Sequence, residues 1–187
     1  MTLTEKAQTY HDQADAFLHE SGLIRCLEQF GSTFIEGAYA GNVMLHGDVD
    51  IGVVREKEFE MAEMFEVAKT IHLATTSRFM SYYIKSDWDD PKLGNAKPVG
   101  RLIMLKALIQ EERWNFDIWF ISAAERARIL NAGHLDISTI AITPEQRENI
   151  LKFKQYRKDN GLTVSGQRIY ELVIQEQTRD PAVLKTS

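Results

Sequence analysis

Residues 37–54, which read Gly-Ala-Tyr-Ala-Gly-Asn-Val-Met-Leu-His-Gly-Asp-Val-Asp-Ile-Gly-Val-Val, contain the pattern that decides the fold. The second half of this stretch, residues 49–54, is rich in β-branched residues and predicts a strand. Because alternate side chains of a strand share a face, Asp48 and Asp50 point to one side while their apolar neighbours enter the core. Two carboxylates roughly 7 Å apart repel each other unless one is protonated, solvent screens them, or a cation lies between them.

A lone acid interrupts a second apolar stretch, Phe-Asp-Ile-Trp-Phe at residues 116–120. In a strand, the aromatic and aliphatic residues occupy one face and Asp117 projects from the other. A carboxylate in the middle of such a strand is costly unless it is paired, hydrogen-bonded or metal-bound. If this strand lies beside residues 49–54, three carboxylates share a face and can hold one or two divalent ions such as Mg²⁺, which prefers oxygen ligands.

The rest of the first two thirds of the chain alternates between helical and strand patterns. Periodicity predicts helices over residues 4–30, divided by Gly22, and over 58–71, with a glycine-punctuated turn and short helix within 37–47. It predicts strands at 33–36, 78–88, 101–110 and 115–122, a loop at 89–100, and a hairpin turn at 111–114. This order favours an α+β fold, with a mixed β-sheet of about five strands flanked by helices.

The hairpin turn sets a register for its two strands. A tight turn at residues 111–114 pairs Leu108 with Asp117 and places Lys106 on the same face one step along. Lys106 is therefore a candidate for binding phosphate, with Arg101 on the same hairpin and Lys92 and Lys97 in the preceding loop as other sources of positive charge.

Two regions follow from this pattern, a core at residues 1–122 and a C-terminal helical segment at 123–187 packed on it. Thr143, Pro144 and Gln146 form a capping box that predicts a helix start. Residues 143–187 carry eight basic and six acidic side chains. The helix after Thr143 carries five basic residues, which we interpret as a solvated face rather than a nucleic-acid surface. They are Arg147, Lys152, Lys154, Arg157 and Lys158. The end of the chain beyond Thr178 is expected to be mobile.

Composition limits the class of protein. The chain has 187 residues, 44% of them hydrophobic, and a net charge of −5, which suits a globular protein and disfavours bulk nucleic acid as a partner. The single cysteine, Cys26, cannot form an internal disulfide, and we find neither a signal peptide nor an apolar run of about 20 residues that could span a membrane. These features predict a cytoplasmic protein.

The order of these motifs resembles the nucleotidyltransferase superfamily with the polymerase-β-like fold, especially its small stand-alone members. In that family a glycine and a small residue follow the first strand, Asp-x-Asp lies on the second, and a lone Asp lies on a later strand. Here these places are taken by Gly37 and Ala38, by Asp48 and Asp50, and by Asp117. The resemblance covers about residues 20–122, and Ala38 stands where the family usually has serine.

This resemblance implies a specific chemistry. Asp48, Asp50 and Asp117 would be the catalytic acids and the ligands of two Mg²⁺ ions, and Gly37, Ala38 and Lys106 would contact the nucleotide. The donor would be a nucleoside triphosphate, and its nucleoside monophosphate would pass to a hydroxyl of an unidentified small molecule or protein. A homodimer is possible.

Two other functions are compatible with the same residues. Ala38 and the shortage of basic residues within the motif favour a catalytically inactive relative that serves as a binding or regulatory module. A metal-dependent phosphohydrolase that uses His46, Asp48 and Asp50 is the third alternative, although the further histidines typical of such sites are missing.

Overall fold

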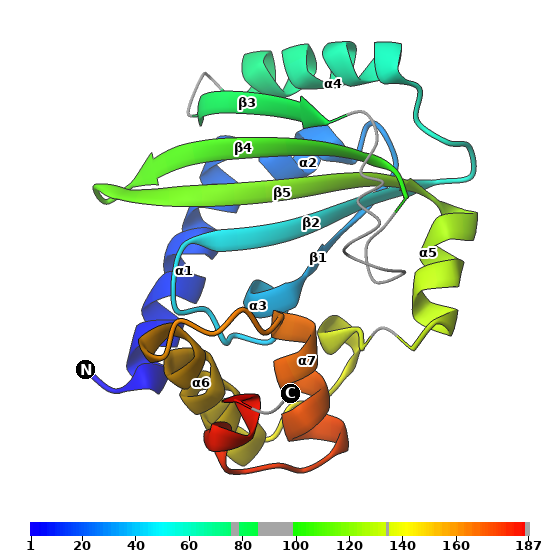
Figure 1. The fold of residues 1–187 in the computed structure, drawn as a ribbon. Coiled ribbons are helices and arrows are strands. Elements are labelled where there is room, and N and C mark those ends of the chain that lie inside the picture. The colour runs from blue at the N-terminus through cyan, green and yellow to red at the C-terminus, as the bar shows by residue number, and fades with distance from the viewer. Residues whose placement is uncertain (76–78, 86–98, 134, 186–187) are drawn as a thin grey trace.

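The protein is built around one five-stranded sheet, whose strands lie one above another in Figure 1. The computed structural model describes residues 1–75, 79–85, 99–133 and 135–185. The strand order is β1 (Ser32–Glu36), β2 (Asp48–Arg55), β5 (Glu112–Ser122), β4 (Arg101–Ile109) and β3 (Phe79–Lys85). Strands β2 and β5 are parallel, and the other neighbouring pairs are antiparallel. This mixed sheet with its helices confirms the α+β prediction.

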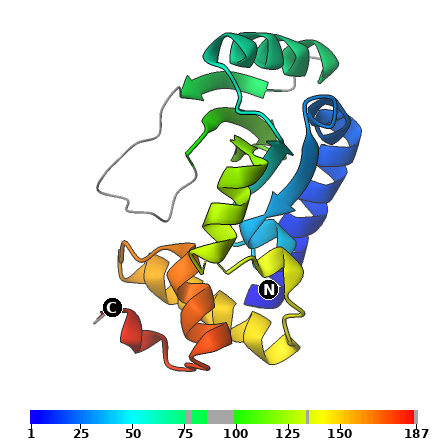
Figure 2. The same cartoon turned by 90° about the vertical axis from the view of Figure 1, so that its right-hand side faces the viewer.

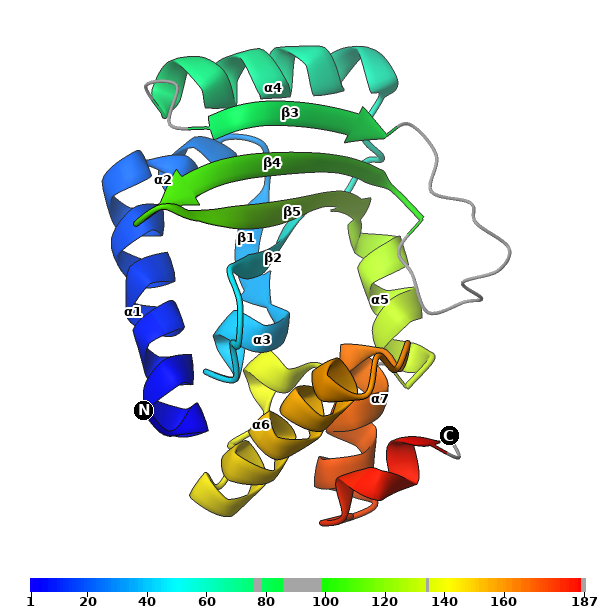
Figure 3. The ribbon, with the colours of Figure 1, turned by 60° about the vertical axis from the view of Figure 1, so that its left-hand side comes forward.

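Three helices cover one face of the sheet: α1 (Leu3–Ser21), α2 (Leu23–Leu27) and α4 (Met61–Ala74), as Figure 3 shows. Gly22 divides α1 from α2 as predicted, because its φ of 71° lies in the left-handed region that favours glycine. The alternating apolar residues of β2 and β5 pack under these helices. Phe116 is fully buried there, and its ring lies 5.1 Å from that of Phe17 and 5.5 Å from that of Phe79.

The C-terminal elements lie together on the other side of the sheet, next to the short helix α3 (Gly37–Ala40) (Figures 1 and 2). They are α5 (Ala123–Asn131), η2 (Ile137–Thr139), α6 (Pro144–Asp159), α7 (Gly166–Tyr170), a π-helical turn η3 (Glu171–Gln175) and η4 (Pro181–Lys185). Thr143 and Gln146 form the predicted capping box at the start of α6.

A second hydrophobic cluster joins these C-terminal elements to the rest of the chain. Ala7 of α1 and Val43 and Leu45 of the loop between α3 and β2 pack with apolar residues of α6 and α7. Leu184 of η4 is also buried in this cluster, so the prediction of a mobile end beyond Thr178 is wrong through residue 185. The division of the chain at residue 122 stays a prediction.

The hairpin between β4 and β5 turns earlier than the sequence suggested. Its two-residue turn is Gln110 and Glu111, which both have positive φ (48° and 67°), the backbone of a type I′ turn. The prediction missed this turn because neither residue is a glycine or an asparagine. The register therefore pairs Met104 with Asp117, and Leu108 pairs with Arg113. Side chains of α1 bind both ends of the turn, since Gln13 contacts Gln110 and Tyr10 contacts Glu112.

Some predictions fall outside the described residues. The predicted strand at 78–88 is described over β3, whereas Arg78 and residues 86–88 are not described. The predicted loop at 89–100 is described only at its last two residues, and Lys92 and Lys97 lie outside that part. Within the described part of the chain, no helix is both long enough and apolar enough to cross a bilayer.

The aromatic core gives a stability prediction. Replacing Phe116 by Ala removes a buried ring that packs against both α1 and β3, so we expect the free energy of unfolding to fall by about 3–5 kcal/mol. Urea denaturation followed by circular dichroism measures this loss. The matched control is Phe65→Ala, because the Phe65 side chain on α4 is exposed. Equal losses for the two variants would contradict this assignment of the core.

Candidate active site

Three carboxylates lie side by side where β1, β2 and β5 run next to one another. The antiparallel pairing of β1 with β2 sets Glu36 opposite Asp50, and the parallel pairing of β2 with β5 sets Asp117 beside Asp50. Asp48 precedes Asp50 by two residues and shares its face. The juxtaposition of Asp48, Asp50 and Asp117 expected from the sequence is therefore present, and Glu36 is an additional acid that sequence reasoning missed.

Asp50 is the most perturbed acid of this group. Burial of its carboxyl and the charges of Asp48, Asp117 and Glu36 raise the pKa of Asp50 from 3.8 to about 7. The raised pKa means that a negative charge at this position is poorly compensated by the protein itself. A cation bound between the carboxylates would stabilise the ionised form.

The glycine of the motif lies directly against this acid. Gly37 opens α3 with a φ of 63°, and a Cβ added to it would overlap Oδ2 of Asp50. Another residue at this position would therefore be strained by its backbone and would displace the carboxylate. Ala38 follows and lines the cavity described below, and it lacks the hydroxyl that the motif resemblance would bring to a phosphate.

The opposite side of the site comes from the C-terminal segment. Lys154 of α6 is only 8% exposed, and its ammonium donates to the carbonyl oxygen of Val43 at 3.0 Å and lies 5.2 Å from the ring of Tyr170. Burial and the charge of Arg157 lower the pKa of Lys154 to about 7, while Asp50 and Asp48 oppose this shift. The prediction of a solvated face is wrong for Lys154. Lys154 lies three and four residues after Leu151 and Ile150, which are buried. Residues at this spacing share a helix face, so the sequence already indicated that Lys154 would be buried.

Two neighbouring cavities lie beside α6, and the first of them separates the sheet from α6 and α7. The first, of about 630 Å³, has Asp48 and Asp50 in its wall together with Gly37, Lys154 and Tyr170. Its remaining lining is largely apolar or basic: Ile51, Trp119, Ile121, Arg126, Ile129, Leu135, Ile137, Arg157 and Arg168 are among it. Asp117 lies one strand further along and is not part of this lining.

The second cavity has the same volume, about 630 Å³, and a different chemistry. Its side chains are apolar, hydroxyl or basic, including Lys154, Arg157 and Lys158, and no Asp or Glu of the described chain lines it. His46 borders both cavities, and burial lowers its pKa while Asp48 opposes that shift. Basic side chains thus face the acid row, although the motif itself contains none.

Lys106 lies elsewhere. It pairs with Asn115, two residues from the position beside Asp117, and its ammonium lies 5.4 Å from the ring of Tyr83. The sequence-based pairing of residue 108 with Asp117 is wrong, and Lys106 is not among the described residues that line either cavity. Its contact with a nucleotide stays a prediction.

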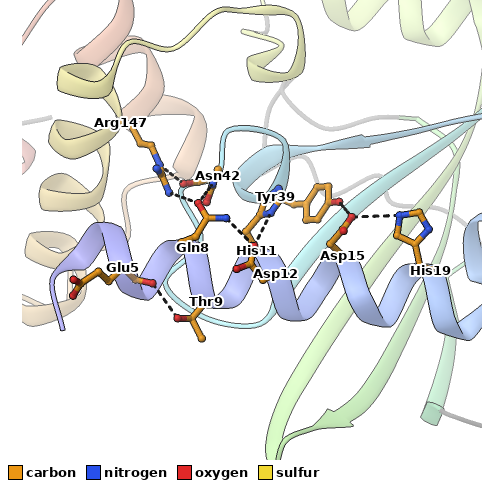
Figure 4. Close-up of polar contacts among 10 residues, drawn as sticks. All are labelled: Glu5, Gln8, Thr9, His11, Asp12, Asp15, His19, Tyr39, Asn42 and Arg147. Atoms are coloured by element: carbon orange, nitrogen blue, oxygen red, sulfur yellow. Dashed lines mark hydrogen bonds and ion pairs between the residues drawn. The ribbon is translucent and has the colours of Figure 1, made fainter.

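A chain of polar contacts holds the loop after α3 between α1 and α6 (Figure 4). Arg147 of α6 donates to the carbonyl oxygen of Asn42 at 2.8 Å, and the Asn42 side chain donates to Gln8 of α1 at 2.7 Å. The hydroxyl of Tyr39 donates to Asp15 of α1 at 3.0 Å. The second half of α3 and the loop after it are therefore fixed by neighbours that are distant in sequence.

The acid row offers oxygen ligands of the kind that bind magnesium. Carboxylate oxygens are the ligands that Mg²⁺ prefers, and the raised pKa of Asp50 marks a position that a cation would favour. Within the described residues, no three His, Cys, Asp or Glu side chains form a group that could by itself hold a metal ion. Asp48 and Asp50 would hold the ion on the cavity side, with Asp117 beside them.

Several solved structures have a fold similar to that of this chain. The terminal RNA uridylyltransferase Cid1 superposes with a TM-score of 0.53 at 13% identity, over 89% of this chain and 47% of Cid1. The non-canonical poly(A) polymerase GLD-2 in complex with GLD-3 gives a TM-score of 0.56 at 14% identity, over 100% of this chain and 63% of that one. GLD-2 in its complex with RNP-8 gives a TM-score of 0.56 at 10% identity, over 98% of this chain and 60% of that one.

The chain has the polymerase-β-like nucleotidyltransferase fold. It spans about half to two thirds of the length of these solved chains. No protein-family model matches the sequence, and no curated protein matches it either. The likeness is therefore one of structure, and it confirms the fold that the order of motifs suggested.

The raised pKa of Asp50 makes a pH prediction. Between pH 4 and 7 the unfolded chain loses this proton and the folded chain retains it, so stability falls as pH rises through that window. In the absence of divalent ions, Asp50→Asn should remove this dependence and be more stable than wild type at pH 7.5, by up to about 4 kcal/mol for three pKa units.

Urea denaturation of both proteins at pH 4.5 and 7.5 measures the effect, and Asp12→Asn is the control because the Asp12 side chain is 67% exposed. If the free energy of unfolding of both variants depends on pH as it does in wild type, Asp50 does not carry the proton assigned to it.

Proposed function

We propose that the protein is a metal-dependent nucleotidyltransferase that transfers a nucleoside monophosphate from a nucleoside triphosphate to a hydroxyl group. The observation that carries the proposal is the position of Asp50, a mostly buried acid between Asp48 and Asp117 that faces the basic residues of α6 across a cavity. The nucleotidyltransferase fold supports the same reaction class, because Cid1 and GLD-2 are described as a uridylyl transferase and a poly(A) polymerase.

In this proposal the three aspartates have two different roles, metal binding and proton acceptance. Asp48 and Asp50 would hold magnesium on the cavity side, and the metal would supply positive charge for the phosphates. Asp117 lies on the next strand and accepts the proton of the acceptor hydroxyl. The hydroxyl oxygen then bonds to the α-phosphorus, the bond between that phosphorus and the bridging oxygen breaks, and pyrophosphate leaves.

The two cavities suit the two parts of the donor. The second cavity offers cations without acids, so we place the β- and γ-phosphates there, against Lys154, Lys158 and the backbone of Ala38. The first cavity has apolar walls such as Ile137 and Trp119, so we place the nucleoside there. The α-phosphate then lies between the cavities, beside Asp48 and Asp50.

A direct test is magnesium-dependent nucleotide binding. Calorimetry with a non-hydrolysable triphosphate should show binding by wild type only when Mg²⁺ is present. Asp50→Asn should lose about tenfold or more in affinity, because one charged ligand is gone. If wild type and Asp50→Asn bind equally weakly with and without Mg²⁺, this function is wrong.

A second prediction concerns the buried lysine. Lys154→Met keeps the length of the side chain and removes its charge, so nucleotide affinity should fall by about 2–5 kcal/mol if the ammonium meets a phosphate. Lys152→Met is a matched control on the same helix, because Lys152 is 51% exposed and pairs with Glu148. Equal affinities for the two variants would place the phosphates elsewhere.

One observation favours the second candidate, an inactive binding module with this fold. Ala38 brings no hydroxyl to the wall of both cavities. Such a module can bind a nucleotide without turnover, so release of pyrophosphate separates the two functions. Release with any hydroxyl acceptor excludes the module, and Ala38→Ser should strengthen nucleotide binding in either case, since one phosphate contact is added.

A further inference from the structure

Arg126 joins three parts of the chain at the edge of the first cavity. It lies on α5, one turn after β5, and its guanidinium binds Glu36 at 2.6 Å and Asp136 at 2.7 Å. The same guanidinium lies 3.8 Å from the ring of Phe34 on β1. Its side chain is 19% exposed, and it lines the cavity that also contains Asp48 and Asp50.

The two carboxylates that Arg126 binds differ in their surroundings. Glu36 lies directly opposite Asp50 on the neighbouring strand, so its charge borders the acid row. Asp136 precedes η2, its side chain is 6% exposed, and it also accepts hydrogen bonds from the backbone and hydroxyl of Ser138. One partner thus belongs to the candidate site, and the other to the connection between α5 and α6 within the C-terminal segment.

The position of Glu36 matters for a negatively charged donor. Glu36 immediately precedes Gly37, the glycine against Asp50, and it lines the same cavity. Without a cation beside it, a fourth carboxylate would face the phosphates in a site that already holds three acids, and like charges at close range repel each other. One guanidinium nitrogen of Arg126 donates to Glu36 and the other donates to Asp136, and the charge-assisted bond to Glu36 compensates the charge of this carboxylate and fixes its direction.

We propose that Arg126 is a positioning residue of the donor site, which binds Glu36 and so keeps its carboxylate from opposing the nucleotide phosphates beside Asp50. This inference rests on the proposed function, and it assigns Arg126 a role through Glu36 rather than through contact with the nucleotide. The ion pair with Asp136 has the separate role of anchoring α5 to the connection before α6.

The two roles can be separated with paired variants. Arg126→Gln should weaken binding of a magnesium-bound, non-hydrolysable triphosphate by about tenfold and lower the free energy of unfolding of the nucleotide-free protein. Adding Glu36→Gln should restore nucleotide affinity to within about threefold of wild type without restoring stability, because Asp136 stays buried without its cation. Adding Asp136→Asn instead should restore stability without restoring affinity.

The two double variants carry the same net charge, so a general electrostatic effect would restore affinity equally in both. Calorimetry gives the dissociation constants, and urea denaturation gives the stabilities without any ligand. Failure of Glu36→Gln to restore affinity, or equal restoration by both double variants, would overturn the role assigned to Arg126. Wild type that binds no nucleotide contradicts the proposed function instead, and the stability couplings still report whether Arg126 binds Asp136 as described.

Discussion

The parallel pairing of β2 with β5 is the constraint on which the site depends. It sets Asp50 beside Asp117 although 67 positions separate them in the numbering of the chain, and it buries the apolar faces of both strands under α1, α2 and α4. The same alternation that sends Val49 and Ile51 into the core sends the carboxylates to the other side. Burial of the core therefore forces like charges together, a cost that the fold meets with hydrophobic packing.

The positive charge opposite the acids comes from α6, and the sequence pattern near the acids does not specify where this helix packs. Lys154 lines the same cavity as Asp48 and Asp50 because α6 packs on the loop between α3 and β2, where Val43 and Leu45 join the second hydrophobic cluster. Packing energy in that cluster holds the ammonium in a place where burial lowers its pKa. The acids and the cation are thus positioned by separate hydrophobic clusters, and their relative geometry follows from how the clusters meet.

The sequence predicted the parts that depend on short-range alternation. The acids on one face of β2, the lone Asp117 on β5, the break at Gly22 and the capping box at Thr143 follow from spacing within a few residues. The errors arose where distant residues decide. The hairpin turn at Gln110 and Glu111 carries no glycine or asparagine, and contacts from α1 accompany it.

The pair formed by Glu36 and Arg126 shows why the cations were harder to find than the acids. An acid on an apolar strand conflicts with its local surroundings, so the conflict is visible in a few residues of sequence. An arginine on an amphipathic helix is compatible with its local sequence, so nothing nearby marks it as functional. Its role depends on which carboxylates the fold brings to it. Arg126 stands 90 positions after Glu36 and ten before Asp136, and only the fold brings the three together. Charges that act across elements must be identified from the assembled structure, because the energy that places them comes from the packing of other residues.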